Sequence, residues 1–119
     1  MGLRKEVCFV KLSDFHAYRV SLELAAELRP VVERVERRDR SLANQMQRAA
    51  TSLVLNLAEG NHKIGKGKRK FFCDAAGSAA EVEACLDLVK VWGFLDPAEL
   101  ESARELLDRV GAMLYRLTH

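Results

Sequence analysis

The sequence predicts an all-α protein, an antiparallel up-down-up-down four-helix bundle. Apolar residues recur at spacings of three and four along several long segments, which is the period of an amphipathic helix. Glycine and proline are sparse, at 7 and 2 of 119 residues, and no stretch alternates apolar and polar residues long enough to indicate a sheet. A chain of this length with 49% hydrophobic residues forms one domain. We assign residues 14–119 to the bundle and residues 1–13 to an N-terminal arm.

The first predicted helix covers about residues 14–38. Its apolar stripe consists of Phe15, Tyr18, Leu22 and Ala25, then Leu28, Val32 and Val35. The stripe shifts between its two halves, and Pro30 lies close to the shift. Because proline removes a helical hydrogen bond, we expect a kink at this position.

The second and third predicted helices cover about residues 41–60 and 68–92. The core-facing residues of the second are Ala43, Met46, Ala50, Leu53 and Leu57. Those of the third are Phe72, Ala75, Ala79, Val82, Leu86 and Val89. Ser41 is the expected N-cap of the second helix, and Gly93 is the expected C-terminal stop of the third.

The fourth predicted helix covers about residues 97–118. Its apolar seam is Leu100, Ala103, Leu107, Val110, Leu114 and Leu117. Asp96 is suited to cap it, Pro97 occupies the first helical position, and Glu99 has the spacing of a capping box. Short connections between four such helices favour antiparallel neighbours.

The third helix also carries small or apolar residues outside its seam. They are Gly77, Ala80, Ala84, Cys85, Leu88 and Trp92. Two explanations remain open: the helix is tightly buried within one chain, or it is shared with a neighbouring subunit. The pattern favours the second explanation, because a helix in a small bundle has few neighbours of its own chain.

The connection after the second helix resembles a phosphate-binding loop in part. Gly60, four residues, Gly65 and Lys66 follow the G-x-x-x-x-G-K pattern. However, Gly67 replaces the hydroxyl residue, and the segment follows a helix where that loop requires a strand. We therefore expect no nucleotide site.

The sequence predicts neither a metal centre nor an enzyme. A di-iron bundle needs Glu-x-x-His on two helices, and only Glu59 and His62 have this spacing. No nucleophile, base and orienting group stand out as a set. Three widely spaced cysteines favour a reducing cytoplasm, and no apolar run is long enough to cross a membrane. We expect no cofactor and no membrane partner.

Positive charge is concentrated in residues 61–70, which we expect to form the connection between the second and third helices. This segment holds five cations and no acid, whereas residues 71–119 hold four basic and nine acidic residues. The five are Lys63, Lys66, Lys68, Arg69 and Lys70. They form either a solvated loop or a patch that binds the phosphate backbone of RNA or DNA. The bundle topology brings this segment, the N-terminal segment and the C-terminus to one end.

A polar stripe follows the second helix on the side away from its core residues. It consists of Gln45, Arg48, Ser52, Asn56 and Glu59, which lie within about 80° of one another on a helical wheel. The stripe is either solvated surface or a hydrogen-bonded seam at a helix or subunit contact. Ser78 and Glu81 of the third helix are suited to meet it, with Arg48 as the partner of a carboxylate.

Residues 41–95 contain an ordered set of motifs that resembles the bacterial four-helix-bundle protein family. The set is Gln45, Arg48-Ala49-Ala50, Ser52, Asn56-Leu57-Ala58-Glu59-Gly60, Phe72, Ala76-Gly77-Ser78, Glu81 and Gly93-Phe94-Leu95. Members of that family include proteins encoded within intervening sequences of large-subunit ribosomal RNA genes. Accessory variability proteins of diversity-generating retroelements are also members.

The resemblance implies a homopentameric ring in which the polar stripe, Gly77 and Ser78 make structural contacts. For the retroelement relatives it also implies a basic surface that binds nucleic acid and a reverse transcriptase. We therefore expect a non-enzymatic homo-oligomer that binds nucleic-acid backbone through the five cations of residues 61–70. The alternative is a protein-assembly module that binds no nucleic acid.

Overall fold

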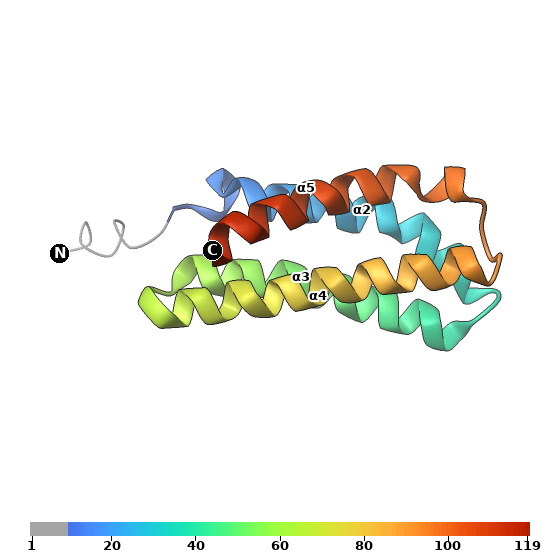
Figure 1. Ribbon diagram of the computed structural model, residues 1–119, viewed down its shortest axis with the longest axis horizontal. Coiled ribbons are helices and arrows are strands. Elements are labelled where there is room, and N and C mark those ends of the chain that lie inside the picture. The colour runs from blue at the N-terminus through green and yellow to red at the C-terminus, as the bar shows by residue number, and fades with distance from the viewer. Residues whose placement is uncertain (1–9) are drawn as a thin grey trace.

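The computed structural model describes residues 10–119, and these residues form a bundle of four long helices (Figure 1). The helices are α2 (His16–Glu36), α3 (Arg40–His62), α4 (Gly65–Val91) and α5 (Glu101–Thr118). Short 3-10 turns, η1 (Leu12–Asp14) and η2 (Pro97–Leu100), precede α2 and α5. The predicted all-α four-helix bundle is confirmed. Of the N-terminal arm predicted at residues 1–13, residues 1–9 lie outside the described part of the chain.

Consecutive helices run in opposite directions, so that the bundle measures 55 × 22 × 22 Å. Each of α2 and α4 packs against both α3 and α5, and α3 with α4 is the closest pair. Figure 1 shows the α3–α4 connection, the C-terminus and the segment before α2 at one end of the bundle. This end, called the basic end below, is defined by residues 10–14, 61–70 and 116–119.

The predicted core faces of three helices are buried. Every seam residue predicted for α3 and α4 is buried, and on α5 only Leu117 is half-buried. These side chains meet in one contiguous core along the bundle axis. Helical periodicity was sufficient to place these faces, because the seam residues recur at spacings of three and four along each helix.

The predicted core face of α2 is wrong in part. The buried apolar residues are Ala17, Val20, Leu24, Leu28, Val31 and Val35, whereas the predicted Leu22 is 44% exposed. The buried stripe runs past Pro30 without a shift, and the helix continues through this residue. Because α2 carries two adjacent apolar stripes, the sequence does not show which one faces the core.

Two helix ends match the sequence and one does not. Gly93 has φ of 68° and donates its N–H to the carbonyl of Lys90 at 3.1 Å, which ends α4 as expected. The Glu99 carboxylate accepts the backbone N–H of Asp96 at 2.9 Å. Ser41, however, lies inside α3, because the Asp39 carboxylate caps this helix by accepting the N–H of Leu42 at 2.9 Å.

The connection predicted at residues 61–70 is much shorter than expected. Only Lys63 and Ile64 lie between α3 and α4, and Gly65 has φ of 59°. The remaining cations of the segment therefore lie on the first two turns of α4. Two glycines and many lysines indicated a loop, but tertiary packing at the end of α3 overrides this weak local preference.

Candidate nucleic-acid interface

The two helices at the basic end approach each other closely at Gly60. A Cβ atom at Gly60 would lie 2.6 Å from Cε1 of Phe72 and 3.2 Å from Cβ of Phe71. Phe72 is buried and packs against Phe15, the residue directly before α2, with 5.9 Å between the ring centroids. Glycine at position 60 is therefore required for α3 and α4 to pack at this distance.

Asn61 connects three segments at the same end. Its buried side-chain amide donates to the carbonyl of Val10 at 2.6 Å, and its backbone carbonyl accepts from Nζ of Lys68 at 3.3 Å. The first described residue, the end of α3 and the first turns of α4 are thus held together. Sequence reasoning missed Asn61, because one polar residue at a helix end carries no distinctive signal.

The five cations singled out in the sequence have different environments. Lys68 lies over the ring of Phe72 at 5.5 Å, in addition to its bond with Asn61. Lys70 forms an ion pair with Asp74 at 2.9 Å. The contacts of Lys68 join the start of α4 to the end of α3, whereas Lys70 and Asp74 are an exposed pair within α4.

The other three cations are available on the surface. Lys63 lies 6.0 Å from the ring centroid of Phe71 but is exposed. Lys66 and Arg69 are exposed, and neither has an ion-pair or hydrogen-bond partner among residues 10–119. They lie on the N-terminal turns of α4, where the unpaired amides add partial positive charge. This surface is suited to bind anions.

The structure brings part of the polar stripe of α3 together with α4. The Ser78 hydroxyl donates to the Ser52 hydroxyl at 2.8 Å. The Asn56 amide donates to the carbonyl of Ser52 at 2.9 Å and to its hydroxyl at 3.0 Å. These three residues therefore form a hydrogen-bonded seam between the helices of one chain.

The remaining stripe residues stay at the surface. Gln45, Arg48 and Glu81 border a shallow polar groove between α3 and α4 with a volume of about 340 Å³. Within the described part of the chain, Arg48 and Glu81 form no ion pair with each other. Glu59 is exposed near the end of α3. A subunit contact at these residues stays a prediction.

The outer face of α4 is not covered by the chain itself. We define this face by Gly77, Ala80, Ala84, Leu88 and Val91, all of them exposed. A Cβ atom at Gly77 would meet nothing within 4 Å. Val91 is 74% exposed, and the neighbouring Trp92 is 52% exposed. Tight burial within one chain therefore does not explain these residues, although it does explain Cys85, which is buried.

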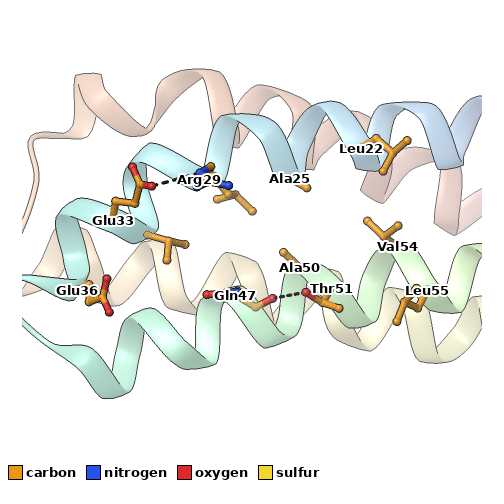
Figure 2. A pocket seen from close by; sticks show the side chains of 12 residues that line it. Leu22, Ala25, Arg29, Glu33, Glu36, Gln47, Ala50, Thr51, Val54 and Leu55 are labelled. Carbon is orange, nitrogen blue, oxygen red and sulfur yellow. Dashed lines mark hydrogen bonds and ion pairs between the residues drawn. The ribbon is translucent and has the colours of Figure 1, made fainter.

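A second apolar surface lies between α2 and α3 (Figure 2). This groove has a volume of about 540 Å³. Leu22, Val54 and Leu55 contribute apolar side chains, and an Arg29–Glu33 ion pair of 3.2 Å lies on the α2 side. The groove contains part of the α2 stripe that the sequence had assigned to the core, namely Leu22, Ala25, Leu28 and Val32. Its apolar lining is thus available to a partner.

The sequence of this bundle matches a known protein family. The model of the 23S rRNA-intervening sequence protein family matches residues 13–116, a span that begins before α2 and ends in the last turn of α5. The chain belongs to this family. No curated protein and no solved structure matches the chain. The resemblance to proteins of ribosomal RNA intervening sequences is thereby confirmed, and the part that concerns retroelements stays a prediction.

The family description is compatible with a nucleic-acid-related role and names no binding residue. Within residues 10–119, no group of three or more His, Cys, Asp or Glu side chains is placed to hold a metal ion. No helix in this range is long and apolar enough to cross a membrane. Burial raises the pKa of the Cys85 thiol above its ordinary value, which keeps this thiol in the less nucleophilic form. Cys73, in contrast, is exposed.

Proposed function

We propose that this member of the 23S rRNA-intervening sequence protein family is a non-enzymatic, homo-oligomeric bundle that binds RNA or DNA backbone. The observation that carries the proposal is the surface at the basic end formed by Lys63, Lys66 and Arg69. Their charges and the N-terminus of α4 attract phosphate groups. The cysteine content of the chain supports a cytoplasmic location.

Binding of this kind is electrostatic and largely independent of base sequence. Each phosphate that is neutralised releases condensed counterions, so affinity falls as salt concentration rises. Lys68 and Lys70 contribute to the local field, but Lys68 bonds the Asn61 carbonyl across the connection and the charge of Lys70 is paired with Asp74. The surface at the basic end is therefore best tested by changing only Lys63, Lys66 and Arg69.

The test is binding of labelled single-stranded RNA and duplex DNA across a salt series. In the variant, Lys63, Lys66 and Arg69 are changed to Ala. A matched control changes Arg37, Arg40 and Lys90 to Ala, which removes the same charge from exposed positions at the opposite end of the bundle. We expect the slope of log affinity against log salt to fall by about 2 to 3 in the first variant only.

Two results would contradict this proposal. An equal change in slope for both variants would mean that net charge alone governs binding, with no defined surface. Absence of binding by the unmodified protein at low salt would remove the nucleic-acid function. The protein-assembly alternative would then be the better explanation of the molecule.

The homo-oligomeric part of the proposal is supported by two unlike apolar surfaces. One is the outer face of α4, and the other is the α2–α3 groove. Contact between unlike surfaces of identical chains is heterologous, and such contacts close into rings when the rotation permits. Five subunits, as the family resemblance implies, would carry five basic ends and increase affinity through multivalency. A reverse transcriptase partner rests on the resemblance alone.

Assembly is tested by light scattering on Val91→Glu, with Ala112→Glu on α5 as control. Val91 is the last residue of α4, and Ala112 lies inside α5. Both are exposed, but only Val91 belongs to the outer face of α4. A charge placed in an apolar contact is costly, so Val91→Glu should lower the assembled mass and Ala112→Glu should not. A monomeric unmodified protein would refute the homo-oligomer.

A further inference from the structure

We propose that Ile64 is an apolar wedge that contacts an unstacked base or sugar of the bound nucleic acid. This inference rests on the proposed function and adds a residue that selects the form of the nucleic acid. Ile64 is 65% exposed in the two-residue connection between α3 and α4. Lys63 precedes it directly, and Lys66 follows two residues later.

The backbone holds Ile64 in an extended conformation at this connection. Its φ and ψ are −129° and 160°, and those of Lys63 are −97° and 172°. Gly65 then turns the chain into α4 with φ of 59°, a conformation that favours glycine. Since only two residues join the helices, Ile64 has little freedom to fold back onto the bundle.

Contacts on both sides of the connection make it rigid. On the α3 side, Gly60 lies directly against the ring of buried Phe72. Across the connection, Nζ of Lys68 bonds the carbonyl of Asn61 at 3.3 Å. A backbone that is already held in place loses little conformational entropy on binding, and the β-branched side chain of Ile64 adds few rotamers to be fixed. Ile64 is thus pre-organised to insert into a partner.

The surroundings of Ile64 match the chemistry of nucleic acid. Phosphates bound by Lys63, Lys66 and Arg69 would bring sugars and bases to the apolar side chain between them. Aliphatic wedges flanked by cations insert between base steps, and this costs least where bases are already unstacked. We therefore expect a preference for loops and bulges over a regular duplex.

Phe71 is a poorer candidate for this contact. It is half-buried, and the ammonium groups of Lys63 and Lys70 lie 6.0 Å and 5.3 Å from its ring centroid. A half-buried ring flanked by two ammonium groups offers less surface for stacking on a base than a fully exposed side chain does. Ile64 is the exposed apolar residue that the basic segment 61–70 presents to solvent.

The experiment compares Ile64→Ser with Ile64→Leu in the full chain. The probes are an RNA hairpin that carries a fluorescent adenine analogue in its loop, and a regular duplex of the same length. We expect Ile64→Ser to bind the hairpin about tenfold more weakly, because the buried apolar area is lost, and Ile64→Leu to remain within about twofold. The salt slope should be unchanged in both, since no cation is removed. Emission from the analogue should rise with the unmodified protein and with Ile64→Leu, but not with Ile64→Ser.

The outcomes separate this inference from the proposed function. If the unmodified protein binds the hairpin and Ile64→Ser binds it equally well, the wedge is refuted and phosphate binding stands. If the unmodified protein binds neither RNA nor DNA, both proposals fall. Vesicles that contain phosphatidylglycerol provide the last arm. Binding to vesicles but not to RNA, lost in Ile64→Ser, would make Ile64 a membrane contact and overturn the inference.

Discussion

Gly60 and Gly77 lie in the same pair of packed helices, yet their surroundings are opposite. A methyl group at Gly60 would collide with the buried ring of Phe72 at 2.6 Å, whereas one at Gly77 would meet nothing within 4 Å. The chain itself requires the first glycine. It does not require the second, although glycine inside a helix costs about 1 kcal/mol relative to alanine. The cost of Gly77 is therefore consistent with the proposed contact between subunits at this face.

The comparison extends from the two glycines to the two faces of α4. The inner face meets α3 through buried Phe72 and the Ser78–Ser52 hydrogen bond of 2.8 Å, both of which are contacts within the chain. The outer face exposes Leu88 and Val91. Substitutions on the inner face should therefore change the stability of the chain, and substitutions on the outer face should change its assembly.

The largest effect is expected for Gly60→Ala. The ring of Phe72 is buried and must shift to admit the added methyl group, so the free energy of unfolding should fall by about 1 to 3 kcal/mol. Urea unfolding followed by circular dichroism measures the change. Phe72→Leu combined with Gly60→Ala should recover part of the loss. An unchanged stability would show that α3 and α4 separate easily at this end.

A smaller loss is expected for Ser78→Ala. The substitution removes the donor to Ser52, while the Asn56 amide still bonds the Ser52 hydroxyl at 3.0 Å. The cost should be about 1 kcal/mol in the same urea experiment. Thr51→Ala is a control, because its hydroxyl bonds only the Gln47 carbonyl of its own helix at 2.9 Å. If the two substitutions lower the free energy of unfolding equally, the hydrogen bond between α3 and α4 contributes no more to stability than one within a single helix.

Gly77→Ala should act in the opposite direction on the isolated chain. At a concentration low enough to favour monomers, alanine should raise the free energy of unfolding by about 1 kcal/mol through helix propensity. At higher concentration, the added methyl group should weaken assembly and lower the mass measured by light scattering. A loss of stability in the dilute sample would show instead that Gly77 is needed within the chain.

The smallest effect is expected at the opposite end of the bundle, where an ion pair on the surface takes the place of packing. The backbone N–H of Asp96 and the guanidinium of Arg34 lower the pKa of Glu99 below its ordinary value of 4.5. A carboxylate with a lowered pKa stabilises the fold above that ordinary value, and this contribution is lost as pH falls through the folded-state pKa.

Glu99→Gln tests this contribution. The variant should be slightly less stable than the unmodified protein near neutral pH, and the two should converge as pH falls through the folded-state pKa of Glu99, because the carboxylate is then protonated. The cost of Gly60→Ala should not change over the same range, because no titratable group lies in that contact. A stability difference for Glu99→Gln that persists in acid would assign the effect to packing.

Some features were predictable because they depend on residues close together in the chain. Periodicity placed the core faces of α3, α4 and α5, and Gly93 marked the end of α4. The face of α2 was not predictable, because Leu22 and Leu24 belong to two adjacent apolar stripes of similar strength. Which stripe is buried depends on the direction in which α3 and α5 approach.

The candidate site was predictable in composition and not in arrangement. The sequence showed five clustered cations, but it did not show that Lys68 and Lys70 are engaged by Asn61 and Asp74. It also predicted a ten-residue connection where the structure has only Lys63 and Ile64 between the helices. Both helices continue beyond their predicted ends, to His62 and from Gly65, where Gly60 packs against Phe72. This contact joins residues 12 positions apart, so local sequence patterns do not reveal it.

The sequence by itself determined the helical class, the order of the helices, the concentration of charge at one end and the family. These properties follow from local periodicity and composition, which each segment carries without its neighbours. The tertiary structure alone decided which side chains remain available at the surface. Exposure of Ile64, Gly77 and the α2–α3 groove depends on what the rest of the chain leaves uncovered, and only the packed bundle defines this.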